Sequence, residues 1–130
     1  MIPGEKKKYG YWRGRARSFR YAWHGIVTLF RNEANAQFHL GAACAVIVAG
    51  WLLGLSAGEW VAVSLCIGGM FAAEGFNTAV ETLCDYCCKE RNPLIGKVKD
   101  VAAGAVLMMA VSAVAVGLII FLPKFLALFR

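Results

Sequence analysis

Acidic residues are scarce in this chain. Only 8 of its 130 residues are Asp or Glu, against 14 Lys or Arg. Ser- or Pro-rich linkers, internal repeats and low-complexity tracts are absent as well. A chain of this length leaves no room for a second domain, so residues 1–130 are expected to form one unit.

The first thirty residues contain no apolar core followed by a cleavage site, which argues against a cleaved secretory signal. Apolar residues dominate instead: 59% of the chain is hydrophobic and the mean hydropathy is +0.57, whereas soluble domains are about 45–50% apolar. The excess lies in long runs, which predict transmembrane helices over about residues 38–55, 60–85 and 101–122, the last ended by Pro123. We therefore expect a small all-α integral membrane protein whose first span serves as its insertion signal.

Basic residues are concentrated before Glu33 and in a predicted loop over residues 86–100. Residues 1–16 are expected to be flexible, and the pattern from Arg17 onward predicts an amphipathic helix on the membrane surface. Beside membrane spans, such charge is typical of the cytoplasmic face and of anionic lipid rather than of nucleic acid. The turn at 56–59 has no Lys or Arg, so the N-terminus and the 86–100 loop should be cytoplasmic and the C-terminus outside.

An acidic stripe closes the second apolar run. Its polar residues recur at i, i+3, i+4, i+7 and i+11, on one face of a helix: Glu74, Asn77, Thr78, Glu81 and Asp85. A charge inside a membrane costs roughly 2.5–3.5 kcal/mol on insertion scales, so these carboxylates need a cation, a ligand or a basic partner. Glu81 and Asp85 could simply cap the helix at the water boundary, but Glu74 lies about 10 Å deeper at a rise of about 1.5 Å per residue.

Acids and a lysine at the cytoplasmic face suit phosphoryl transfer. Mg²⁺ binds through one or two carboxylates together with substrate phosphates, and a deeper carboxylate can accept a proton from an attacking hydroxyl. A hydroxyl at that depth belongs to a lipid. The P-loop and the kinase glycine-rich loop are both missing, so any kinase here is of another kind.

Two other classes compete with this interpretation. A small proton-coupled transporter also uses an intramembrane Glu, but it has no need of Lys99-Asp100 and usually has four spans. A structural or assembly subunit would have no reason to bury Glu74.

Five cysteines are present, and three of them form a CxxCC cluster at Cys84, Cys87 and Cys88. A zinc site would need a fourth ligand, and His24 and His39 are distant in the sequence. Reduced cytoplasmic thiols are the simpler interpretation. His24 is expected on the polar side of the N-terminal helix.

The motif Glu74-x-x-Asn77-[Ser/Thr]-Ala79-x-Glu81-x-x-x-Asp85, followed by Lys99-Asp100 and an Ala-Val-Leu run, resembles the prokaryotic diacylglycerol kinase family. That family includes diacylglycerol kinase of Gram-negative bacteria and undecaprenol kinase of Gram-positive bacteria. The resemblance extends to Asn32-Glu33-Ala34 and Tyr21-x-Trp23-x-Gly25, and it covers about residues 17–122.

The resemblance implies a homotrimer of three-span subunits in the bacterial inner membrane, with an N-terminal surface helix and active sites between neighbours. It implies ATP and Mg²⁺, with Glu74 as the general base on the lipid hydroxyl and Glu33 and Glu81 as ligands of the metal held by ATP. Other positions matching the family's ATP site are Tyr21, Asn77, Asp85, Glu90, Lys99 and Asp100. The lipid would contact Trp23 and Glu74.

The chain departs from the family pattern at three positions. The family's N-terminal arginine aligns with Gly14, where Arg13 or Arg15 could substitute. Serines of the Gram-negative form are replaced by Ala22 and Ala103, which resembles the undecaprenol kinase side. The lipid, diacylglycerol or undecaprenol, stays open at this point.

Overall fold

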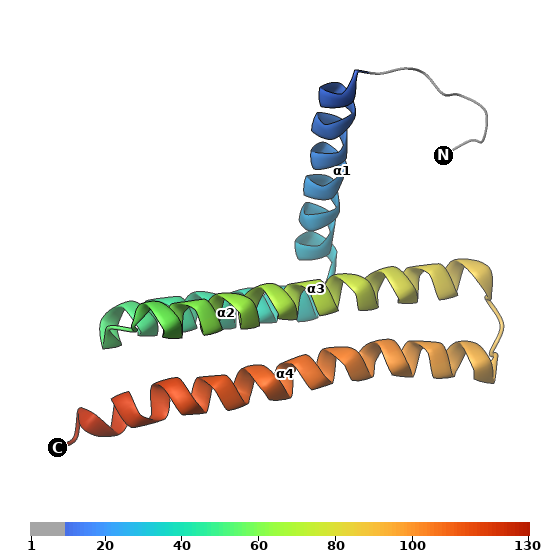
Figure 1. The fold of residues 1–130 in the computed structure, drawn as a ribbon. Helices are drawn as coiled ribbons and strands as arrows, with labels where there is room; N and C mark the ends of the chain where they lie inside the picture. Colours follow the sequence, from blue (N-terminus) through green and yellow to red (C-terminus); the bar gives the residue numbers. More distant parts are fainter. Residues whose placement is uncertain (1–9) are drawn as a thin grey trace.

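The computed structural model describes residues 10–130, in which all regular structure is helical (Figure 1). The helices are α1 (Tyr11–Asn32), α2 (Ala34–Leu53), α3 (Ala57–Cys87) and α4 (Pro93–Ala127). The last three are each long and apolar enough to cross a membrane. The prediction of an all-α protein is confirmed for the described residues, and the three candidate spans match the predicted number.

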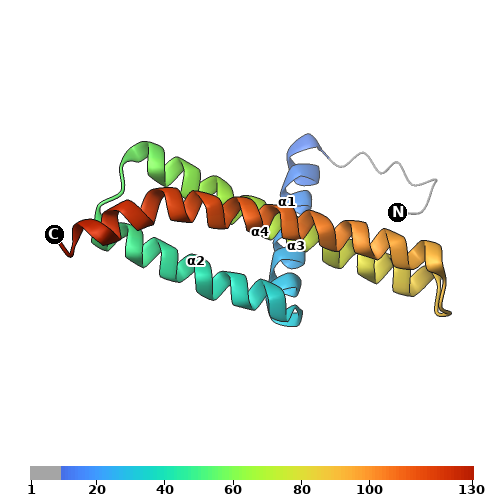
Figure 2. The ribbon, with the colours of Figure 1, turned by 90° about the horizontal axis from the view of Figure 1, so that it is seen from below.

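The helices differ in length, and this shapes the molecule. α3 and α4 run antiparallel along one another, and α2 packs beside the half of α3 that begins at Ala57 (Figures 1 and 2). α1 meets the bundle near its middle and extends away from it, crosswise to α3 (Figure 1). Beyond α1 only α3 and α4 continue, and we call this part, which follows Gly75 in α3, the distal arm.

Local sequence explains where the helices begin and end. Gly54 ends α2 in the left-handed conformation, with φ of 68°, which glycine adopts without steric cost. Ser56 then opens α3 in a capping box: its side chain accepts from the Glu59 N–H, and the Glu59 carboxylate accepts from the Ser56 N–H at 2.8 Å. Lys124 of α4 pairs with the same carboxylate at 3.2 Å, which ties the ends of α3 and α4 together.

The first helix begins at Tyr11, so the predicted start at Arg17 was wrong. The guanidinium of Arg15 donates to the Tyr11 hydroxyl at 3.1 Å and lies over its ring, an i, i+4 pair that stabilises the first turn. Residues 11–16, which were expected to be flexible, are therefore helical in the structure. The part of that prediction that concerns residues 1–9 lies outside the described residues.

The last helix begins at Pro93 rather than near residue 101, so the predicted 86–100 loop is reduced to residues 88–92. Asn92 is the N-cap, because its side chain accepts from the Leu94 N–H, and Pro93 fits the first turn, where no N–H is needed. The helix also passes Pro123, which was expected to end it. Proline removes only one backbone donor there, and the neighbouring Lys124 is anchored on Glu59.

The hydrophobic core within this one chain contains few buried residues, and some of them are small. The buried hydrophobic residues are Ala36, Ala43, Val63, Met70, Cys84 and Ile120. Phe30 of α1 meets Phe71 of α3 edge to face, with ring centroids 4.9 Å apart. Most large apolar side chains of the described residues are exposed, which suits a chain surrounded by lipid or by other subunits.

The substitution Gly50→Ala should destabilise the protein. A Cβ at Gly50 would lie 2.8 Å from the Trp60 ring, and a rigid indole ring cannot move aside as the end of a flexible side chain can. We expect a loss of about 1–3 kcal/mol in the free energy of unfolding, typical of overpacking. Denaturant unfolding in detergent would measure it. Gly58→Ala is the control, because nothing lies within 4 Å of the added Cβ; equal stability of the two variants would contradict the packing argument.

Candidate active site

Glu74 is the most buried charged residue among those described, with 2% of its surface exposed. It lies on α3 where α1 crosses the bundle, beside Gly75, at which an added Cβ would touch Leu29 of α1. Its Oε1 lies 3.3 Å from Nε2 of His39, which belongs to α2. A carboxylate is thus enclosed at the junction of three helices, with an imidazole as its ionisable partner.

Asn77 and Glu81 lie one and two turns further along α3. The Asn77 side-chain amide donates to the Glu81 carboxylate at 3.2 Å, as their i, i+4 spacing allows. The carbonyl Oδ1 of Asn77 is buried and has no hydrogen-bond partner among the described residues. A buried acceptor without a partner costs about 1–3 kcal/mol, so this oxygen suits a donor or a cation brought by a ligand.

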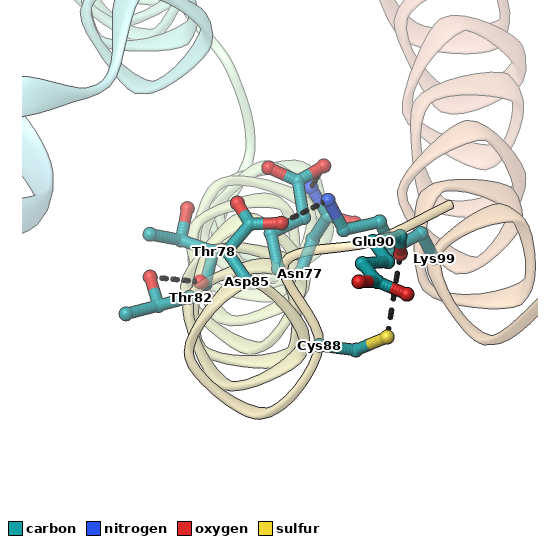
Figure 3. Close-up of polar contacts among 8 residues, drawn as sticks. Asn77, Thr78, Thr82, Asp85, Cys88, Glu90 and Lys99 are labelled. Atoms are coloured by element: carbon teal, nitrogen blue, oxygen red, sulfur yellow. Dashed lines mark hydrogen bonds and ion pairs between the residues drawn. The ribbon is translucent and has the colours of Figure 1, made fainter. Parts of the chain in front are cut away.

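Asp85 and Lys99 join the two helices of the distal arm. The Lys99 ammonium contacts Asp85 Oδ1, and the close-up shows it reaching across from α4 to α3 (Figure 3). The Asp85 side chain is 69% exposed and that of Lys99 is 35% exposed. Exposed ion pairs are weak, so phosphate oxygens can replace the carboxylate as partner of the lysine.

The oxygen donors of this region fit a magnesium ion. Glu81 supplies a carboxylate and Asn77 an amide oxygen without a partner. Mg²⁺ bound together with nucleotide phosphates needs only one or two protein carboxylates. Within residues 10–130, no three His, Cys, Asp or Glu side chains converge as a cage for a metal would require, and this includes the CxxCC cluster.

The other predicted site residues lie on α1, at the α1–α2 junction, in the 88–92 connection and on α4. Glu33 caps the junction of α1 and α2 and is half-buried. Tyr21 and Trp23 lie on α1 with 63% and 67% of their surface exposed. Glu90 belongs to the 88–92 connection, where its backbone carbonyl accepts from the Cys88 thiol (Figure 3). Asp100 is exposed on α4.

Sequence analysis missed His39 as a site residue. It was weighed only as a distant partner for the cysteine cluster, whereas in the fold it faces Glu74. Its ring also lines an apolar cavity of about 480 Å³ between α2, α3 and α4. The available signal was an imidazole inside a predicted span, six residues after Glu33.

Comparison with known proteins places the sequence in a family. The sequence profile of prokaryotic diacylglycerol kinase matches residues 20–121. The chain belongs to the prokaryotic diacylglycerol kinase family. This membership decides against the transporter and assembly-subunit alternatives and agrees with three membrane spans.

Three proteins similar in sequence to this chain are named as lipid kinases. The chain is 48% identical over 108 residues to the undecaprenol kinase of Bacillus subtilis (strain 168), covering 83% of this chain and 88% of that protein. It is 38% identical over 112 residues to the diacylglycerol kinase of Synechocystis sp., covering 85% of this chain and 64% of that protein. It is 30% identical over 89 residues to the diacylglycerol kinase of Haemophilus influenzae, covering 68% of this chain and 75% of that protein. The family therefore implies a nucleotide-dependent lipid kinase at a bacterial membrane.

Two ion pairs join α3 to α4, and they should respond differently to mutation. Lys99→Met should lower phosphate transfer to lipid by about 100-fold or more, the usual effect of removing one group that stabilises transition-state charge. Lys124→Met breaks the pair with Glu59 at the other end of the hairpin and should leave transfer unchanged. Both should unfold close to the wild-type temperature. Equal activity of the two variants would remove Lys99 from the site.

Proposed function

We propose that this chain is an ATP-dependent kinase that transfers the γ-phosphoryl group to the hydroxyl of a polyprenol, undecaprenol, in preference to diacylglycerol. The undecaprenol kinase of Bacillus subtilis supports the choice of lipid, because it matches at 48% identity over 88% of its own length. Ala22 and Ala103, which replace serines of the Gram-negative pattern, favour the same lipid.

The observation that carries the proposal is the depth of Glu74. α2 has 20 residues and is therefore about 30 Å long, the thickness of the hydrocarbon core. If α2 spans that core, α1, which ends where α2 begins, marks one surface of the bilayer. Glu74 lies at the level of α1, where a lipid hydroxyl would be found. The distal arm, with Asp85 and Lys99, then extends into the water that contains ATP (Figure 1).

The charges support a cytoplasmic position of the distal arm. Basic residues of α1, of the α3–α4 connection and of the start of α4 lie on the same side of the spans, among them Lys89, Arg91 and Lys97. Cytoplasmic segments carry this excess of Lys and Arg. At the opposite end Lys124 is paired with Glu59, so that side presents little free positive charge.

In the proposed reaction Glu74 accepts the proton of the lipid hydroxyl. The hydroxyl oxygen attacks the γ-phosphorus, the bond from phosphorus to the bridging oxygen breaks, and ADP leaves with that oxygen. Lys99 exchanges Asp85 for phosphate oxygens and neutralises part of their charge. Mg²⁺, held by Glu81 and Glu33 with help from Asn77, would supply further neutralisation of the phosphates.

A homotrimer would complete this site. Within one chain the structure joins Asn77 to Glu81 and Asp85 to Lys99, and no group of three His, Cys, Asp or Glu side chains among the described residues could hold a metal. We propose that neighbouring subunits share one site for ATP and lipid. The residues gathered there would be Tyr21, Trp23, Glu33, Glu90 and Asp100, with Arg13 or Arg15 at the nucleotide.

The proposal is tested by phosphate transfer from labelled ATP in mixed micelles, with undecaprenol and diacylglycerol compared side by side. We expect labelled undecaprenyl phosphate and much slower labelling of diacylglycerol. Labelling of diacylglycerol alone would overturn the choice of lipid and keep the kinase. Folded protein with Mg²⁺ that labels neither lipid would overturn the kinase.

Glu74→Gln should nearly abolish transfer, by about 10²–10⁴-fold, because an amide of the same shape cannot accept the hydroxyl proton. ATP binding and the unfolding temperature should stay near wild type, since the nucleotide contacts lie further along the arm. Glu59→Gln, at the other end of α3, is the control and should remain active. Full turnover of Glu74→Gln would exclude it as the base.

A further inference from the structure

His39 is the one ionisable residue that the structure pairs with Glu74 in the described part of the chain. Its Nε2 lies 3.3 Å from Oε1, with the Glu74 side chain 3% exposed and that of His39 23% exposed. α2 contains no Lys, Arg, Asp or Glu, so this imidazole is its sole contribution to the charged groups of the site.

We propose that His39 is a positioning residue for Glu74. An ionised carboxylate can only accept, so the 3.3 Å contact is favourable when Nε2 carries a proton that faces Oε1. This holds one carboxylate oxygen and leaves the other free for the acceptor hydroxyl. The inference rests on the proposed role of Glu74 as the base.

The surroundings of His39 restrict what its ring can do. On one side it borders the apolar cavity, which is lined besides His39 by apolar residues and Cys66. The ring also meets Phe38 edge to face, with centroids 5.6 Å apart. The contact with Glu74 is therefore the polar function available to Nε2, and it also offsets part of the cost of burying the carboxylate.

Glu74 needs such a partner because its side chain has three rotatable bonds. Catalysis requires the accepting oxygen within hydrogen-bond reach of the hydroxyl, and small displacements of a reacting group lower rates steeply. A donor on α2 fixes the carboxylate against a second helix rather than leaving it to α3 alone. The pair thus makes the base depend on how α2 packs against α3.

The test compares His39→Gln, which keeps an N–H donor, with His39→Leu, which fills the space without one. We expect His39→Leu to lower kcat by about 100-fold, the cost of a misplaced reacting group, and to change KM for ATP less than about twofold. His39→Gln should recover kcat to within about tenfold of wild type. Phe38→Leu, which alters the ring's packing but not the donor, should keep the wild-type kcat.

A double variant separates positioning from an independent role. If His39 acts through Glu74, adding His39→Leu to Glu74→Gln should lower the residual rate no further. Should His39→Leu fail to fold, His39→Met takes its place as the variant without a donor.

Three outcomes would overturn the inference. A folded His39→Leu variant with a wild-type kcat would make the contact incidental. Equal inactivity of folded His39→Gln and His39→Leu would indicate that His39 itself takes the proton. A further loss in the double variant would show a role independent of Glu74. By contrast, a wild-type protein that phosphorylates neither lipid would contradict the proposed function itself, and this result would be known before any His39 variant is measured.

Discussion

The burial of the Glu74 carboxylate is the constraint on which the rest of this structure depends. An enclosed carboxylate is costly unless hydrogen-bond donors or cations face it. Here three helices meet around it: α3 carries it, α2 brings His39, and α1 closes over the neighbouring Gly75 through Leu29. A Cβ added at Gly75 would meet Leu29 at 3.8 Å, an ordinary contact distance, so α1 passes close to the residue beside the acid. The edge-to-face pair of Phe30 and Phe71 fixes the same crossing one turn away.

The two ends of the α3–α4 hairpin handle charge in opposite ways. At one end Glu59 accepts from the Ser56 backbone and from Lys124, so its carboxylate is satisfied within the chain. At the other end Asp85 and Lys99 are more exposed, and the buried Asn77 carbonyl has no partner in the described residues. The first arrangement closes a helix end, whereas the second leaves groups ready for an incoming ligand. Both ends look alike in the sequence, as an acid and a lysine near the limits of apolar runs.

Sequence periodicity predicted contacts between residues of the same helix, but it could not predict contacts between residues of different helices. The i, i+4 spacing placed Asn77 beside Glu81, and their hydrogen bond confirms the acidic face. His39 was missed because it is 35 positions from Glu74, and a single sequence carries no signal that pairs them. The start of α4 was missed because the predicted span was limited to uncharged residues. Lys97, Lys99 and Asp100 were therefore assigned to a loop. They are helical because α4 continues beyond the length that a bilayer needs.

The unequal helix lengths suggest why this fold suits the proposed reaction. A lipid hydroxyl and a nucleotide occupy different phases and can meet only at the boundary between them. α2 begins near that boundary, while α3 with 31 residues and α4 with 35 extend past it. Phosphate-binding groups on the distal arm then lie in water, and the proposed base lies at its root, screened by α1. Because all these residues share α3, their separation along the boundary is set by the rise of one helix, about 1.5 Å per residue. The helical stripe from Glu74 to Asp85 therefore sets the distance between the proposed base, which faces the acceptor hydroxyl, and the groups that would bind the phosphates.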